Sequence, residues 1–141
     1  MPERPTPERT ALDGQAIVEI LRDLNLAVRH HWLVMGAALV LHGVRPTTSD
    51  VDVAVSDVLF GRLARGSSPL RSRSGRPKVA LRPNVTAYQG WIPSSWTLVR
   101  GIQVASLDSI IEEKQVLARP KDLSDIDAIR RYRTQRRSAE S

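Results

Sequence analysis

The stretch HWLVMGAALVLHGVRPTTSDVDVAV, residues 31–55, decides the fold of this chain. Its first part predicts a strand over residues 32–35, a tight turn at Gly36 and a short apolar helix over 37–42. A loop then leads into a second strand that carries Asp50 and Asp52. The other predicted elements lie before and after this strand–turn–helix–loop–strand unit in the sequence.

Asp50 and Asp52 are expected on one face of the second strand, because side chains alternate along a strand. Val51 and Val53 then point to the opposite face. Two neighbouring carboxylates repel each other unless a cation lies between them, and Mg²⁺ prefers carboxylate and phosphate oxygens. The pair therefore predicts a Mg²⁺ site. In the alternative interpretation, the carboxylates bind backbone amides or Arg45 at the start of the strand.

Length and composition predict one domain, because 141 residues suffice for a single hydrophobic core. We expect a disordered lead over 1–9, the domain over 10–133 and a basic disordered tail over 134–141. The sequence contains no cysteine, which excludes a thiolate metal site and a cysteine nucleophile. Its longest apolar run, 32–44, is too short for a membrane span, and residues 1–10 lack the apolar core of a signal peptide. We therefore expect a cytoplasmic protein with no membrane contact.

The net charge of +6 comes mainly from arginine. Basic residues gather in two places, which are Arg71, Arg73, Arg76 and Lys78, and Arg130, Arg131, Arg133, Arg136 and Arg137. Such clusters bind phosphate backbones, or they are solvated loops and helix ends. Both interpretations stay open at this point.

Periodicity and turn residues outline the remaining elements. A structural helix is expected over 10–27, and Asp57 is expected to cap a short helix over 58–64. Residues 71–77 are expected to form a polar loop, and residues 91–96 an irregular apolar segment. Three further strands are predicted, at residues 78–81, 85–88 and 102–104.

Lys114 stands in the middle of an apolar helix face. We expect Ser106 to cap a helix over 107–118, in which apolar residues recur at helical spacing on both sides of Lys114. A lysine on a buried face either extends to water or meets an anion, so a buried carboxylate or a bound phosphate is its expected partner. A last helix over 121–132 follows.

Two blocks of the sequence resemble the nucleotidyltransferase superfamily. The first block contains a strand-to-helix turn at Gly36-Ala37, then Gly43-Val44-Arg45, then Thr48-Ser49-Asp50-Val51-Asp52. The second block contains Lys114 and the run Lys121-Asp122-Leu123-Ser124-Asp125-Ile126. Within the superfamily, the sequence is similar to minimal nucleotidyltransferases and to type IV abortive-infection toxins. The resemblance implies an α+β, nucleotidyltransferase-like (DNA polymerase β-like) fold, a small mixed sheet flanked by helices.

The resemblance also implies an activity, a cofactor and partners. The activity is transfer of a nucleoside monophosphate from ATP or another nucleoside triphosphate to an RNA or protein acceptor, with Mg²⁺. A role as a toxin with a cognate antitoxin is implied as well. Asp50 and Asp52 are the implied catalytic residues and metal ligands. The implied nucleotide-binding residues are Gly36, Ala37, Arg45, Thr48, Lys114 and Lys121.

One part of the family's pattern is missing from this chain. Members normally carry a third carboxylate on a neighbouring strand, but the sequence has no Asp or Glu between Asp57 and Asp108. Asn84 stands where that carboxylate is expected, and an amide does not accept a proton at neutral pH. The alternative to the enzyme is therefore a catalytically inactive protein of this fold that binds nucleotide, nucleic acid or a protein partner.

Overall fold

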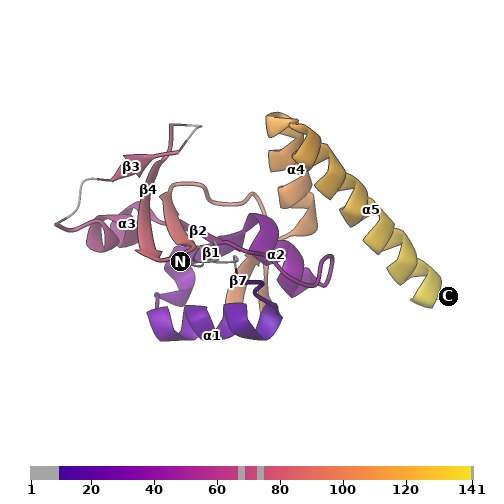
Figure 1. Cartoon of the computed structure of the whole chain (residues 1–141), viewed down its shortest axis with the longest axis horizontal. Coiled ribbons are helices and arrows are strands. Elements are labelled where there is room, and N and C mark those ends of the chain that lie inside the picture. Colours follow the sequence, from indigo (N-terminus) through magenta and orange to yellow (C-terminus); the bar gives the residue numbers. More distant parts are fainter. Residues whose placement is uncertain (1–9, 67–68, 73–74, 141) are drawn as a thin grey trace, which may run out of the picture.

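The computed structural model describes residues 10–66, 69–72 and 75–140, so the lead expected over 1–9 lies outside the described residues. Over the described residues the chain forms one mixed sheet of seven strands with helices around it (Figure 1). The predicted α+β class is confirmed. The prediction of a small sheet is wrong, because seven strands make a larger one.

The strands lie in the order β3-β4-β5-β2-β1-β7-β6 across the sheet. Their bounds are β1 His31–Val34, β2 Val51–Val55, β3 Leu70–Arg71, β4 Pro77–Arg82, β5 Val85–Gln89, β6 Trp96–Val99 and β7 Ile102–Ala105. β2 pairs antiparallel with β1 and parallel with β5, and β1 pairs parallel with β7. The two strands predicted from residues 31–55 therefore form the centre of the sheet.

Two strands were not expected from the sequence. β3 begins just before the polar loop predicted at residues 71–77, and β6 begins at Trp96, which was assigned to an irregular segment. β6 joins β7 through Arg100 and Gly101, whose φ angles are 51° and 80°. Positive φ at both positions is typical of a two-residue hairpin turn, and this turn allows β6 to extend the sheet.

The helices are α1 Gly14–Leu24, α2 Met35–His42, α3 Asp57–Leu63, α4 Leu107–Leu117 and α5 Pro120–Glu140, with a 3₁₀ turn η1 over Val28–His30. α1 is shorter than the helix predicted over 10–27. Asp13 caps its start by accepting a hydrogen bond from the amide of Ala16, and Asn25 ends it in the left-handed region. Before α1, Leu12 forms a β-bridge with Thr48, so the chain there is extended.

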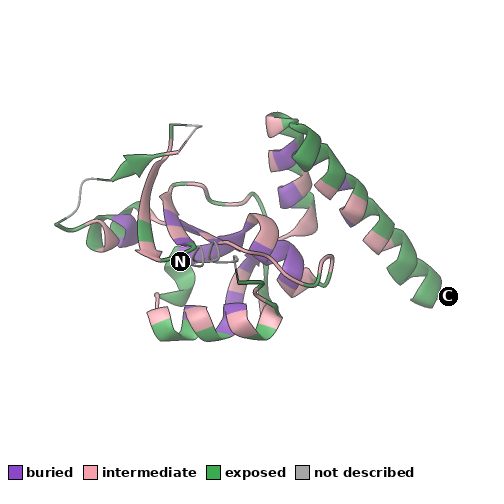
Figure 2. Cartoon of the chain, in the orientation of Figure 1, coloured by how far each residue is buried: buried purple, intermediate pink, exposed green. Residues whose placement is uncertain are grey.

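Two further helix predictions need correction. α3 is capped by Ser56, whose hydroxyl accepts from the amide of Leu59, and Asp57 is its first residue. α5 continues to Glu140, so residues 134–140 are helical although a disordered tail was predicted there. Arg136 lies over the ring of Tyr132, and arginines near a helix C-terminus interact favourably with the helix dipole. The distal half of α5 extends away from the rest of the molecule and is exposed (Figures 1 and 2).

The core lies mainly between the central strands and the helices that cover them. Leu33, Val53 and Val104 are fully buried and belong to one cluster with Ile17 of α1. α5 is tied to this body near its middle, because the Tyr132 hydroxyl donates a hydrogen bond to the carbonyl of His42. Among the described residues, no helix combines the length and hydrophobicity that a bilayer span requires.

Candidate nucleotide-binding site

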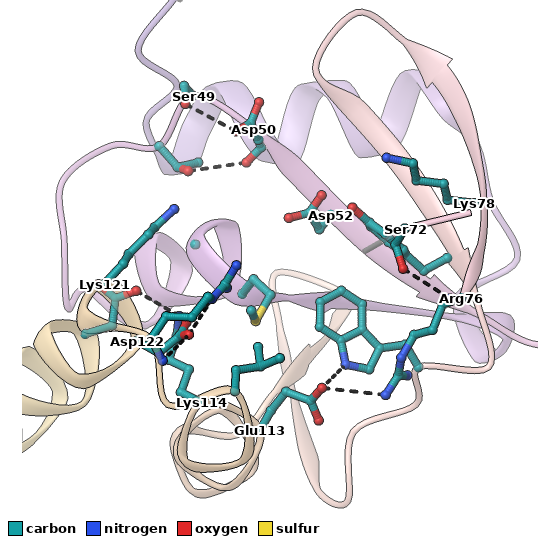
Figure 3. A pocket seen from close by; sticks show the side chains of 18 of the residues that line it. Ser49, Asp50, Asp52, Ser72, Arg76, Lys78, Glu113, Lys114, Lys121 and Asp122 are labelled. Atoms are coloured by element: carbon teal, nitrogen blue, oxygen red, sulfur yellow. Dashed lines mark hydrogen bonds and ion pairs between the residues drawn. The ribbon is translucent and has the colours of Figure 1, made fainter. Parts of the chain in front are cut away.

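One cavity of about 360 Å³ contains most of the residues that the sequence singled out. Its lining includes Asp50, Asp52, Gly36, Arg45, Thr48, Lys114 and Lys121. Asp52 lies on β2 and Asp50 directly precedes this strand, while Lys114, Lys121 and Asp122 face them from α4 and α5 (Figure 3). Ala37, which was expected to bind the nucleotide, is an exception. It is buried in the core and does not line the cavity.

Asp52 carries a carboxyl group that is costly to ionise in the absence of a cation. Burial raises its pKa to about 6, and the charge of Asp50 adds to the rise. A hydrogen bond from Tyr88 and the charges of Lys121 and Lys78 act in the opposite direction. In turn, burial and the neighbouring Asp52 raise the pKa of Tyr88 to about 12. A bound cation would relieve the repulsion between the two aspartates.

The turn before α2 has no room for a side chain at Gly36. A Cβ atom there would lie 2.9 Å from Oγ1 of Thr48 and 3.5 Å from an Nη atom of Arg45. Thr48 is itself fixed by two backbone hydrogen bonds to Leu12. Met35, the first residue of α2, has a φ of 55°, which is strained for a bulky side chain.

No side chain caps the N-terminus of α2. The first backbone N–H groups of any α-helix lack an intrahelical partner, and those of α2 lie at the edge of the cavity around Gly36. A helix N-terminus of this kind binds anions, and phosphate above all, through these groups and the helix dipole.

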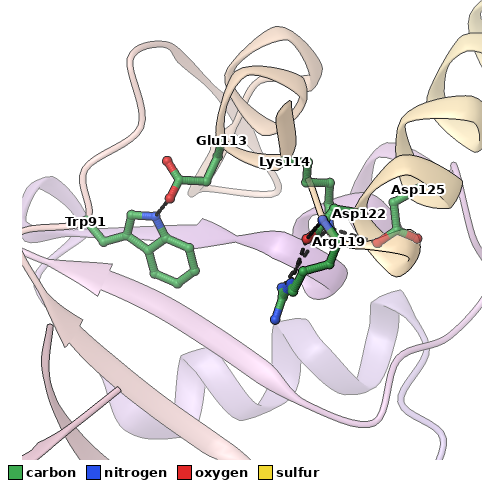
Figure 4. Close-up of polar contacts among 6 residues, drawn as sticks. All are labelled: Trp91, Glu113, Lys114, Arg119, Asp122 and Asp125. Atoms are coloured by element: carbon green, nitrogen blue, oxygen red, sulfur yellow. Dashed lines mark hydrogen bonds and ion pairs between the residues drawn. The ribbon is translucent and has the colours of Figure 1, made fainter. Parts of the chain in front are cut away.

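Lys114 meets buried carboxylates, which is one of the two outcomes that the sequence allowed. Its ammonium lies 2.7 Å from Oδ2 of Asp125 and 3.6 Å from Oδ1 of Asp122 (Figure 4). Lys114 is 2% exposed and Asp122 is fully buried. Although Lys114 lines the cavity, these two carboxylates neutralise its charge. Phosphate binding, the role expected for Lys114, is therefore better suited to the other cations of the cavity.

Arg119 is held at the cavity by the same cluster. Its Nε and Nη2 atoms donate to the two oxygens of Asp122, at 2.6 and 3.2 Å. These hydrogen bonds from Arg119 lower the pKa of Asp122. The Arg119 side chain is 52% exposed, so it reaches solvent at the cavity wall. Arg119 stands between the two parts of the second family-like block, Lys114 and the run that begins at Lys121, but its place in the sequence did not indicate a role in the cavity.

Other cavity residues were also missed. Lys78 of β4 is paired in register with Tyr88 of β5, so both side chains share the face of Asp52. Arg76 stacks over the ring of Trp91, and Trp91 donates through Nε1 to Glu113 at 2.7 Å. Arg76 and Lys78 belong to a basic cluster visible in the sequence. Nothing in the sequence indicated that these two residues line the cavity of the aspartates.

Among the residues that the structure describes, no third carboxylate stands beside the aspartate pair as a potential metal ligand. Thr86 is the register partner of Asp52 on β5, and Asn84 lies in the turn before β5 with a φ of 65°. The backbone carbonyl of Asn84 accepts from the amide of Val51, and the residue does not line the cavity. Glu113, the remaining glutamate of the cavity, accepts the Trp91 hydrogen bond.

Within the described part of the chain, no three His, Cys, Asp or Glu side chains gather as potential metal ligands. Mg²⁺ does not require such a group, because it is commonly held by one or two carboxylates together with substrate phosphates and water. The oxygen-only pair of Asp50 and Asp52 in a cavity lined with cations fits this mode of binding.

No family model, curated protein or solved structure matches the chain. The geometry and charge of the cavity are therefore the guide to its chemistry.

Proposed function

We propose that this protein is a Mg²⁺-dependent nucleotidyltransferase that moves a nucleoside monophosphate from ATP or another nucleoside triphosphate onto an RNA or protein acceptor. One observation carries the proposal. Asp50 and Asp52 share a cavity with an uncapped helix N-terminus and with basic side chains from three other elements. Carboxylates suit the metal, while N–H groups and cations suit the phosphates.

The proposed reaction balances without any further reactant. A hydroxyl oxygen of the acceptor forms a bond to the α-phosphorus, and its proton passes to water. The bond from the α-phosphorus to the oxygen of the β-phosphate breaks, and pyrophosphate leaves. Mg²⁺ held by Asp50 and Asp52 would neutralise charge on the phosphates and favour loss of the hydroxyl proton.

The chain's own residues mainly bind and orient the triphosphate. The N–H groups at the start of α2 bind phosphate oxygens, and Thr48 and Arg45 lie directly over this turn. Arg119 and Lys121 extend from the opposite wall, where Asp122 fixes the Arg119 guanidinium. Such fixed positive groups stabilise charge that develops on the phosphates in the transition state.

A catalytically inactive nucleotide-binding protein is the second candidate. It is favoured by Thr86, which occupies the position next to Asp52 on the neighbouring strand and does not accept a proton at neutral pH. Such a protein would bind a nucleotide, a nucleic acid or a protein partner without transfer. The resemblance to abortive-infection toxins extends the first candidate to a defence role, with a cognate antitoxin as its partner.

Label transfer tests the proposal directly. The full chain is incubated with Mg²⁺ and each α-labelled nucleoside triphosphate, together with total RNA and total protein. We expect label on one acceptor class with the wild type and with Asp127→Asn, an exposed aspartate of α5 that serves as the matched control. Label is expected to be lost with Asp50→Asn/Asp52→Asn.

Two results contradict the proposal. Label that persists in the double variant would show that the aspartates are not catalytic. No label with any triphosphate, while Mg²⁺ and ATP still raise the melting temperature, would establish the inactive nucleotide-binding protein.

A further inference from the structure

A second cavity, of about 280 Å³, adjoins the cavity of the aspartate pair. Met35, Trp91 and Glu113 line both cavities, so these residues form the boundary between them. We call the second one the α4 cavity, because α4 supplies one of its walls. Figure 4 shows the hydrogen bond between Trp91 and Glu113, with Lys114 on the next position of α4 turned toward α5.

The α4 cavity is apolar at its floor and at its rim. Val34, Ala105 and Ile110 are buried and form part of the lining. Ile92 and Val116 lie at the rim and remain 46% and 83% exposed. Apolar side chains that are left open in this way favour a ligand with a flat apolar face.

The charge of the α4 cavity contrasts with that of its neighbour. No Lys or Arg of the described residues lines the α4 cavity, whereas Arg45, Arg119 and Lys121 line the aspartate cavity. A phosphate chain therefore suits only the aspartate cavity. The carboxylate of Glu112 would repel it, whereas the carboxylate of Glu113 is already paired with the guanidinium of Arg76 at 3.6 Å.

The polar groups of the α4 cavity are mainly acceptors. Glu112 accepts from the hydroxyl of Ser94 at 2.8 Å, and Glu113 accepts from Trp91. The hydroxyl of Ser109 accepts from the amide of Ser94. A carboxylate has about four lone-pair sites, so each glutamate retains capacity for a further N–H donor.

We infer that the α4 cavity binds the base of the nucleotide whose phosphates occupy the aspartate cavity, and that it selects bases with an exocyclic amino group. The inference rests on the proposed function. A nucleobase is planar and uncharged, matching the apolar floor. The exocyclic amino group of cytosine or adenine donates a hydrogen bond to the carboxylate of Glu112. Uracil and hypoxanthine carry a carbonyl oxygen at the equivalent position and cannot donate there. Because Met35 and Trp91 line both cavities, the phosphates and the base of one nucleotide would lie in neighbouring cavities on the two sides of these residues.

The test measures binding to the full chain with Mg²⁺ by isothermal titration calorimetry. CTP is compared with UTP, ATP with ITP, and each of them with inorganic tripolyphosphate. Because a hydrogen bond to a charged group is strong, we expect CTP and ATP to bind roughly tenfold more tightly than their oxo counterparts. Tripolyphosphate, which has no base, is expected to bind more weakly than CTP or ATP.

The variant Glu112→Ala removes the proposed acceptor at an exposed position, so folding is not at risk. This variant is expected to bind CTP and UTP with equal affinity. Its affinity for tripolyphosphate should equal that of the wild type. Glu19→Ala on α1 removes an exposed glutamate on another helix and should keep the wild-type preference. A saturation-transfer NMR experiment that irradiates the protein methyl groups gives a second readout. The signals of the CTP base protons H5 and H6 should decrease more than those of its ribose protons.

The outcomes separate this inference from the proposed function. If tripolyphosphate binds as tightly as CTP and ATP, or if Glu112→Ala keeps the preference for CTP, the base is not bound here although the phosphate site stands. Saturation that reaches mainly the ribose would overturn the inference in the same way. If neither the triphosphates nor tripolyphosphate bind with Mg²⁺, the proposed function itself is wrong.

Discussion

The ammonium of Lys114 lies 2.7 Å from a carboxylate oxygen of Asp125, and this ion pair joins α4 to α5 inside the protein. Fully buried Asp122 completes the cluster and holds the guanidinium of Arg119. The cluster thereby fixes the turn from α4 to α5, and with it the two cations, Arg119 and Lys121, that face the aspartate pair. Lys114 consequently supports the site through structure rather than by contact with phosphate.

This structural role predicts a large loss of stability in Lys114→Met. Removal of the ammonium leaves the partly buried carboxylate of Asp125 without Lys114 and leaves buried Asp122 with Arg119 alone, which costs about 2–3 kcal/mol. Lys121→Met, at an exposed position on the same cavity, should change the free energy of unfolding by about 0.5 kcal/mol or less but weaken Mg²⁺–ATP binding. Urea denaturation and calorimetry measure both quantities. A stable Lys114→Met protein that fails to bind ATP would instead make Lys114 a phosphate ligand.

Gly36→Ala is expected to destabilise the protein because its methyl group would lie 2.9 Å from Oγ1 of Thr48. Overpacking of this kind costs about 1–3 kcal/mol. Thr48→Ala in the same chain removes the clashing atom and should recover most of the loss in a double-mutant cycle. Gly61→Ala is the control. Its Cβ meets nothing within 4 Å, so helix propensity should stabilise it slightly. Additive effects of the Gly36 and Thr48 changes would refute the contact.

The burial of His31 predicts that the fold loses stability in acid. Burial lowers the pKa of His31 below its ordinary value of 6.5, while the hydrogen bond to the carbonyl of Ala27 partly offsets this effect. The unfolded chain therefore binds a proton more readily, and stability is lost as the pH falls below 6.5. His31→Gln should flatten the decrease in urea midpoint between pH 6.5 and pH 5. An unchanged slope in this variant would assign the decrease to other groups.

The central unit of the fold was predictable because its signals are local. Residues 31–55 show a strand, a turn with glycine and an apolar helix, and β1, α2 and β2 agree with the prediction to within two residues, α2 beginning at Met35 instead of residue 37. An anionic partner of Lys114, either a buried carboxylate or a bound phosphate, was predictable because a lysine on an apolar stripe must reach water or meet an anion. The identity of the carboxylates that pair with Lys114 depends on how α5 packs against α4, and this packing cannot be inferred from the sequence.

The missed parts depend on distant contacts. β6 is held by its pairing with β7, and its side chains are mostly exposed, so it lacks the buried alternation that marks a strand. The Arg100-Gly101 turn was the one local indication of this hairpin. In the same way, Lys78 and Tyr88 reach the site only through the register of β4 and β5, which adjoin β2. A register is fixed by the whole sheet.

Asp52→Asn is expected to stabilise the protein while removing its activity. A carboxyl group whose pKa rises from 3.8 to about 6 contributes stability below pH 3.8, and that stability is lost as the pH rises through 6. At pH 8 ionised Asp52 therefore destabilises the metal-free fold, by about 2 kcal/mol after allowance for partial exposure.

Asp52 lies near Asp50, Tyr88, Lys121 and Lys78, so the amide of the variant removes the repulsion from Asp50. Urea denaturation at pH 8 and pH 5, without metal, should show a gain for the variant that shrinks at the lower pH. Addition of Mg²⁺ and ATP should then stabilise the wild type and leave Asp52→Asn unchanged. Asp127→Asn should follow the wild type throughout. A variant that is no more stable at pH 8 would mean that water or a neighbouring cation already compensates the ionised aspartate, and that Asp52 has no need of a metal ion.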